Sequence, residues 1–141
     1  MRYYLSQAGK DRIPLAALSL IPLKPEQPSL GPFQKIAKLS KHPELNKCLE
    51  LDLYALADNP DDPDLGVEVK DTSQPVGAAG VAHFIQVTTK IRPLLDRPAQ
   101  YLFYSENGFT CGQVEVLAEH GIAACDGTLL STYFGEDDPA S

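Results

Sequence analysis

The sequence predicts a single α/β domain built on a mixed central sheet with helices on both faces. Two segments, residues 49–57 and 65–71, alternate apolar and polar side chains with the period of two that is typical of strands. Residues 99–134 read as strand, helix, strand, helix with short links, which favours parallel pairing of their two strands. The length of 141 residues suits one domain with one hydrophobic core.

Prolines interrupt the N-terminal quarter of the chain. We expect residues 13–23 to form an edge strand, because proline is tolerated at strand ends and edges. Residues 24–31 are typical of an extended linker. Residues 32–40 predict a short helix, since Pro32 suits a first helical turn and the apolar residues after it would share one face.

The rest of the chain gives clearer patterns. Residues 49–57 and 65–71 are expected to pair as a hairpin across a polar turn. Residues 76–95 fit a helical face, although their β-branched content also permits a strand, and we expect a helix that ends near Pro93. The last third predicts a strand at 99–104, a helix at 110–120, a strand at 122–125 and a helix at 128–134, with Thr110 as the first helix's N-cap and Gly121 as its stop.

The net charge of −7 comes from two acidic clusters, at residues 58–64 and 136–138. This balance argues against a strong nonspecific nucleic-acid binder, although it permits an enzyme that approaches DNA through one local surface. We expect three parts: residues 1–31 as an N-terminal extension or edge strand with a proline-rich linker, 32–135 as the core, and 136–141 as an acidic tail.

Targeting and redox patterns indicate a cytoplasmic protein. No apolar stretch approaches the roughly 20 residues that a membrane helix needs, and the N-terminus lacks the pattern of a signal peptide. The three cysteines, Cys48, Cys111 and Cys125, are too scattered for a disulfide framework or a zinc site. We therefore expect reduced thiols and no contact with a membrane.

The chemistry centres on Asp52, Glu68 and Lys70. Residues two apart in a strand point to the same face, so Glu68 and Lys70 would project together. If the two strands pair antiparallel, Asp52 can lie beside Glu68. Two neighbouring carboxylates repel unless a cation lies between them, which suits a hard ion such as Mg²⁺. A lysine beside that ion could orient a water molecule or stabilise charge on a phosphate.

These segments resemble the PD-(D/E)XK nucleases, a superfamily that includes restriction endonucleases and archaeal Holliday-junction resolvases. An Asp, a hairpin turn and a Glu-x-Lys between apolar residues form the core motif of that family. The version here is similar to the type IV restriction enzymes, and so is the C-terminal half of the chain. The matching segments are Glu50-Leu51-Asp52-Leu53, Val67-Glu68-Val69-Lys70, Tyr104 to Thr110, His120-Gly121-Ile122 and Asp126-Gly127.

The resemblance covers residues 49–134 and implies a restriction-endonuclease-like mixed sheet flanked by helices, with residues 32–135 as a nuclease-like core. It implies hydrolysis of DNA phosphodiester bonds with Mg²⁺ or Mn²⁺. Asp52 and Glu68 would bind the metal with the Val69 carbonyl, and Lys70 would position the attacking water. Two accessory residues are Gln34, in place of a glutamate that many members carry on the first helix, and Glu50, as an outer acid.

Less specific interpretations remain open. Glu68 and Lys70 could form an exposed ion pair worth under about 1 kcal/mol, and Glu50 could be a solvated strand residue. In function, the alternative is a catalytically inactive nuclease-fold module, as a subunit or domain of a larger defence or mobile-element protein. The acidic balance and Gln34 favour that alternative. The expected partners are DNA and either a second copy of the chain or a larger protein complex.

Overall fold

A five-stranded mixed sheet forms the centre of the molecule. The computed structural model describes residues 13–14, 19–20, 29–30, 33–37, 51–59, 61–94 and 98–134. The strand order is β3-β4-β5-β6-β7. The β3–β4 and β4–β5 pairs are antiparallel, whereas β5–β6 and β6–β7 are parallel. The strands are β3 (Phe33–Ala37), β4 (Leu53–Ala57), β5 (Asp64–Lys70), β6 (Ala99–Ser105) and β7 (Ile122–Asp126).

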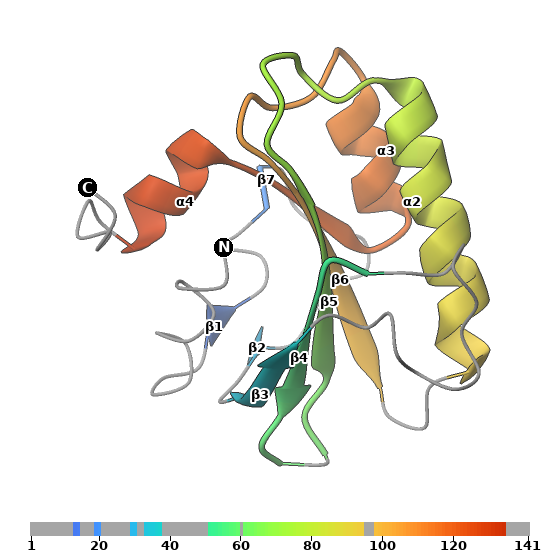
Figure 1. Ribbon diagram of the computed structural model, residues 1–141, viewed down its shortest axis with the longest axis vertical. Coiled ribbons are helices and arrows are strands. Elements are labelled where there is room, and N and C mark those ends of the chain that lie inside the picture. The colour runs from blue at the N-terminus through green and yellow to red at the C-terminus, as the bar shows by residue number, and fades with distance from the viewer. Residues whose placement is uncertain are drawn as a thin grey trace.

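Helices cover both faces of this sheet (Figure 1). Helices α2 (Ala78–Ile91) and α3 (Gln113–Glu119) lie on one face, and α4 (Gly127–Phe134) lies on the other. A 3₁₀ turn, η3 (Arg92–Leu94), ends α2 where the sequence predicted a stop. The predicted α/β class, with its mixed sheet and flanking helices, is therefore confirmed. In the described parts of the chain, no helix is long and apolar enough to cross a membrane.

The core on the α2/α3 face is aromatic. The ring of Phe103 from β6 packs edge-on against Phe84 of α2, with ring centroids 5.1 Å apart, and against Phe109 at 5.4 Å. Tyr54 of β4 and Tyr101 of β6 belong to the same buried cluster. Each aromatic pair stabilises the core by about 1 kcal/mol beyond the area that it buries. The middle of β6 is therefore a rigid support for the residues of β5 that pair with it.

Gly66 allows the chain to pack closely over the centre of β5. A Cβ atom at this position would lie 2.8 Å from Leu51 Cδ1 and 2.9 Å from Tyr101 Cδ1. Leu51 is completely buried and lies two residues before the first residue of β4. A glycine in a strand often marks such a close approach. Because Leu51 is anchored there, the next residue, Asp52, has a fixed position at the end of the hairpin.

Two loops that follow neighbouring parallel strands are joined by backbone hydrogen bonds. The Val76 N–H donates to the Gly108 carbonyl at 2.9 Å, and the Thr110 N–H donates to the Val76 carbonyl at 2.9 Å. The Glu106 N–H also donates to the carbonyl of Lys70, the last residue of β5, at 3.1 Å. The loop after β5 is therefore held against the loop after β6.

The predicted helix at residues 32–40 is wrong, because Phe33–Ala37 is strand β3 and pairs with β4. Pairing with β4, which has a register irregularity between Phe33 and Lys35, gives the segment a neighbouring strand. Tertiary pairing of this kind overrides weak local helix propensity. The remaining residues of the expected helix lie outside the described residues.

The expected linker and edge strand also change. Ser29–Leu30 forms β2, which pairs antiparallel with β1 (Ile13–Pro14) in a separate two-stranded sheet. The edge strand predicted over residues 13–23 is thus two residues long in the described part, and residues 19–20 form a bend. The other residues of both predictions lie outside the description.

The C-terminal third follows the prediction closely. Strand β6, helix α3 and strand β7 form a parallel unit, and Gly121 ends α3 with a positive φ of 71°. Thr110 is not the N-cap, since α3 begins at Gln113 after Gly112, which has a φ of 85°. The left-handed backbone at Gly112 starts the helix later than the sequence suggested.

Candidate functional site

Asp52 reaches across from the start of β4 to the end of β5. The β4–β5 register pairs Leu53 with Val67, so one further step places Asp52 opposite Glu68. Asp52 is exposed and lies in a bend before the strand that was predicted to contain it. Its Oδ2 atom accepts a hydrogen bond from the Val69 N–H at 2.9 Å. The carboxylate is therefore oriented by the backbone of β5.

Glu68 lies half-buried beside this carboxylate. Its neighbour on β6 is Phe103, which belongs to the aromatic core. The pKa of Glu68 is raised from 4.5 to about 8. Burial is the largest cause, a hydrogen bond with Asp52 and repulsion from its charge add to it, and the charge of Lys70 opposes them. Two carboxyl groups that approach this closely titrate as a pair and share a proton near neutral pH.

Lys70 is exposed two residues further along β5, on the same face as Glu68. Its lowering effect on the pKa of Glu68 indicates that the two charges interact. Lys70 pairs with Ser105 and Ser105 pairs with Asp126, so all three residues lie where the parallel strands end. The carboxyl ends of strands are where open α/β sheets bind their ligands.

The arrangement fits a Mg²⁺ ion that has few protein ligands and is otherwise coordinated by water. The N–H and C=O of a strand residue face the same neighbouring strand, so the Val69 carbonyl points to the side of Asp52. Within the part of the chain that the structure describes, no group of three or more His, Cys, Asp or Glu residues could hold a metal. An ion would therefore be held by two carboxylates, a carbonyl and water. Mg²⁺ keeps several waters and needs only one or two carboxylates together with phosphate oxygens.

Of the two predicted accessory residues, Gln34 and Glu50, the structure describes only the backbone of Gln34. Gln34 lies in strand β3, at the edge of the sheet, and not on the helix that the sequence analysis expected. Its side chain is outside the described residues, and Glu50 is outside them altogether. Among the predicted site residues that the structure describes in full, Asp52, Glu68, Val69 and Lys70 lie together.

Asp64, expected in a polar turn, has a structural role that the sequence pattern did not indicate. Asp64 begins β5 and is 1% exposed. Its carboxylate accepts hydrogen bonds from the Tyr54 hydroxyl and the Ala57 N–H, both at 2.8 Å. The period of two that links Gly66, Glu68 and Lys70 extends back to Asp64, and this spacing could have placed it in the strand.

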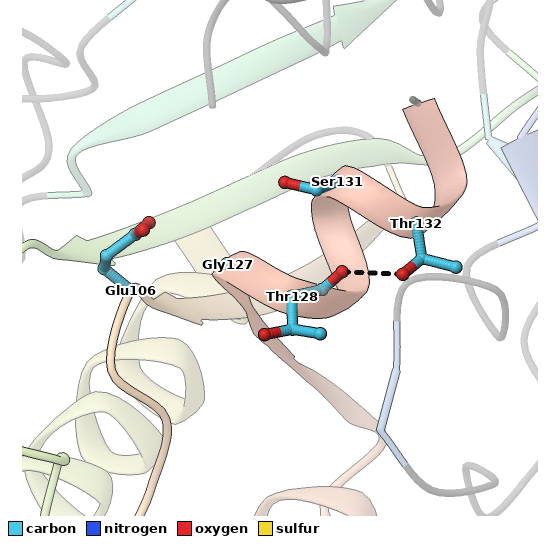
Figure 2. Close-up of a pocket in the computed structure, with 5 residues that line it drawn as sticks. All are labelled: Glu106, Gly127, Thr128, Ser131 and Thr132. Carbon is cyan, nitrogen blue, oxygen red and sulfur yellow. Dashed lines mark hydrogen bonds between the residues drawn. The ribbon is translucent and has the colours of Figure 1, made fainter. Parts of the chain in front are cut away.

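A second polar feature lies beside α4, on the other face of the sheet. A hollow of about 470 Å³ is lined by Glu106, Gly127, Thr128, Ser131 and Thr132 (Figure 2). Glu106 follows β6, and the other four residues come from the first two turns of α4. No local sequence pattern indicates this hollow, because its two segments meet only in the folded chain.

Comparisons with protein-family models, with curated proteins and with solved structures find no match to this chain. What the site does is therefore inferred from its own residues and their arrangement.

Proposed function

We propose that the chain is a divalent-metal-dependent nuclease that hydrolyses phosphodiester bonds in DNA. The observation that supports this proposal is the approach of Asp52 to Glu68, with Lys70 on the same face of β5. A pair of acceptors facing each other destabilises a fold unless a cation relieves it, and perturbed pairs of this kind cluster at functional sites. The likeness of the motif to PD-(D/E)XK nucleases supports the same activity.

Each residue has a defined task in this proposal. Asp52, Glu68 and the Val69 carbonyl hold Mg²⁺ or Mn²⁺. A bound divalent ion polarises a phosphoryl oxygen and lowers the pKa of a bound water. The Val69 N–H keeps the Asp52 carboxylate in one orientation, so little reorganisation is needed when substrate binds. The Lys70 ammonium orients the attacking water and stabilises the charge that develops on the phosphate.

The proposal includes a cytoplasmic location, and a second copy of the chain or a larger complex as partner. Among the described cysteines, Cys111 and Cys125 are both free thiols. Free thiols are typical of a reducing compartment, where DNA and Mg²⁺ are also present.

Metal binding is the first test. Calorimetric titration of the metal-free protein with MgCl₂ and with MnCl₂ should show one saturable ion, and Asp52→Ala should lose it. Asp61→Ala is the matched control, because Asp61 is an exposed acid in the β4–β5 turn, away from Glu68. Binding that survives in Asp52→Ala would contradict the assignment of the ligands.

Cleavage is the second test. With Mg²⁺ or Mn²⁺, the wild type should nick or cut a plasmid or a branched DNA, and Asp52→Ala should cut neither. A wild type that binds the ion but cuts neither substrate would refute DNA hydrolysis while leaving the metal site in place.

The second candidate function is a catalytically inactive module that keeps this fold and binds a partner protein. The small set of two carboxylates favours it, and so does the net charge of −7. A wild type that binds no divalent ion at millimolar concentration would select this alternative over the nuclease.

A further inference from the structure

The hollow beside α4 has a polar lining that the proposed reaction does not use. Among the described residues, this lining has one carboxylate and three hydroxyl groups, and no cationic or large apolar side chain. Its volume of about 470 Å³ lies within the roughly 300–1,000 Å³ of small-ligand sites. The chemistry of the lining therefore indicates a polar ligand of small size.

Glu106 decides what the ligand must offer. The Tyr104 hydroxyl donates a hydrogen bond to its Oε2 atom, and its Oε1 atom would lie 2.8 Å from a Cβ atom at position 127. Gly127 thus leaves room for the carboxylate at the start of α4. A carboxylate only accepts hydrogen bonds and repels other anions. The group that meets Glu106 must therefore be a hydrogen-bond donor, which excludes a phosphate.

The hydroxyl groups of α4 add further acceptors. The Thr132 hydroxyl donates to the Thr128 carbonyl at 2.8 Å, which leaves its oxygen lone pairs for a ligand (Figure 2). Ser131 is exposed, and its hydroxyl can donate or accept. The lining suits a ligand that has an amino group beside both hydrogen-bond donors and acceptors.

The hollow lies at the same edge of the sheet as the candidate metal centre. The Glu106 N–H donates to the Lys70 carbonyl at 3.1 Å, so the hollow begins beside the last residue of β5. It opens on the α4 face, whereas Glu68 and Lys70 project toward the α2/α3 face. Lys70 and the hollow lie at the ends of neighbouring strands, so one nucleic-acid strand that wraps this end of the sheet could reach both.

We propose that the hollow binds a nucleobase that carries an exocyclic amino group, with Glu106 as the acceptor for that group. The identity of the ligand as a nucleotide rests on the proposed function. Glutamate accepts from the N4 amino group of cytosine, and serine and threonine bond either donors or acceptors on base edges. Uracil presents a carbonyl oxygen where cytosine has this amino group, and that oxygen would face a carboxylate.

The test compares deoxycytidine monophosphate with deoxyuridine monophosphate, which differ at this amino group and at the adjacent N3, an acceptor in cytosine and an N–H donor in uracil. In an NMR titration of the metal-free protein, the first nucleotide should shift the backbone amide signals of Gly127, Thr128 and Ser131 saturably. The second should bind about tenfold more weakly, as expected for one lost base contact. Equal affinity for the two nucleotides, or no saturable shift with either, overturns the proposal.

Two variants examine the role of Glu106. Glu106→Gln should abolish the preference, because an amide can both donate and accept. Gly127→Ala should displace the carboxylate and weaken binding of deoxycytidine monophosphate, while the fold is kept because alanine is a better helix former than glycine. Glu119→Gln, an exposed acid at the end of α3, is the control and should bind like wild type. A preference that persists in Glu106→Gln contradicts the proposal.

Further experiments distinguish a base on a DNA strand from a free nucleotide. They also distinguish failure of the nuclease proposal from failure of the hollow proposal. A short oligodeoxycytidylate should bind more tightly than the mononucleotide if the base belongs to a DNA strand, and weaker binding overturns that source. Asp52→Ala should keep the nucleotide shifts while it loses the metal. If wild type binds no metal but shows the preference for cytosine, the nuclease proposal fails and the hollow stands. If wild type binds metal and cuts DNA without that preference, only the hollow proposal fails.

Discussion

Strand β5 carries an acidic side chain near each of its ends, and the surroundings of the two acids differ. One acid receives hydrogen bonds from donors, whereas the other lies beside a second acid. At the start, Asp64 is 1% exposed, and two donors, the Tyr54 hydroxyl and the Ala57 N–H, bond its carboxylate. Near the end, Glu68 is half-buried beside a second acid, Asp52, and burial together with that acid raises its pKa to about 8. Both acids face the same side of the same strand.

This difference separates a structural acid from the acid of the proposed metal site. A buried carboxylate that receives strong donors stabilises the hairpin, and the fold accounts for its presence. A pair of carboxyl groups that must share a proton gives the fold no such benefit. The cation that we propose at the second end of β5 would relieve the repulsion between these carboxyl groups.

The largest expected effect is a loss of stability when the acid at the start of β5 is replaced. Asp64→Ala should lower the free energy of unfolding by about 4 kcal/mol, because it leaves the Tyr54 hydroxyl and the Ala57 N–H buried without their acceptor. Urea denaturation measures the loss. Asp61→Ala, in the exposed turn, should change stability by less than about 0.5 kcal/mol. A small effect of Asp64→Ala would remove the contrast between the two ends.

Lys70→Ala should act on activity and not on the fold. The initial rate of DNA cleavage should fall by at least about 100-fold, which corresponds to about 3 kcal/mol of lost transition-state stabilisation. The free energy of unfolding, measured by thermal denaturation, should stay within about 0.5 kcal/mol of wild type, since Lys70 is exposed. Lys90→Ala, an exposed lysine on α2, serves as the control. A comparable loss of rate in that control would show that general charge, and not Lys70, matters.

The free energy of unfolding of the metal-free protein should depend on pH because of the carboxyl pair near the end of β5. The folded pKa of Glu68, about 8, lies above the ordinary value of 4.5. Its contribution to stability is therefore complete below pH 4.5 and is lost as the pH rises through about 8. After allowance for solvent screening, the loss should be about 2 kcal/mol. Urea denaturation across this range should show the slope in wild type, and Glu68→Gln should flatten it; an unchanged slope would contradict the assignment.

The smallest expected effect is from calcium. At ten times its dissociation constant, Ca²⁺ should raise the free energy of unfolding by about 1.4 kcal/mol through mass action. It should support no cleavage, because Ca²⁺ takes looser coordination than Mg²⁺. Thermal denaturation with and without CaCl₂ measures the shift, and Asp52→Ala should show none. Stabilisation of that variant by Ca²⁺ would place the ion elsewhere.

The sequence predicted the parts of this molecule that depend on local patterns. The period of two placed Glu68 and Lys70 on one face, and the strand, helix and strand of the last third followed from short apolar runs. The helix expected at residues 32–40 became β3, because its pairing with β4 depends on residues distant in the sequence. The partners of Asp64 lie seven and ten residues away, and no local pattern names them. The hollow likewise needs β6 and α4 to meet.

The hydrogen bonds between the loops after β5 and β6 have a consequence for local opening. The loop after β5 cannot leave the surface without breaking the bonds that Val76 makes with Gly108 and Thr110. Native-state hydrogen exchange should therefore report one cooperative unit, in which the Val76, Thr110 and Glu106 amides open with the same free energy. In such a unit, Lys70 on one face of the sheet and Glu106 on the other become ordered or exposed together.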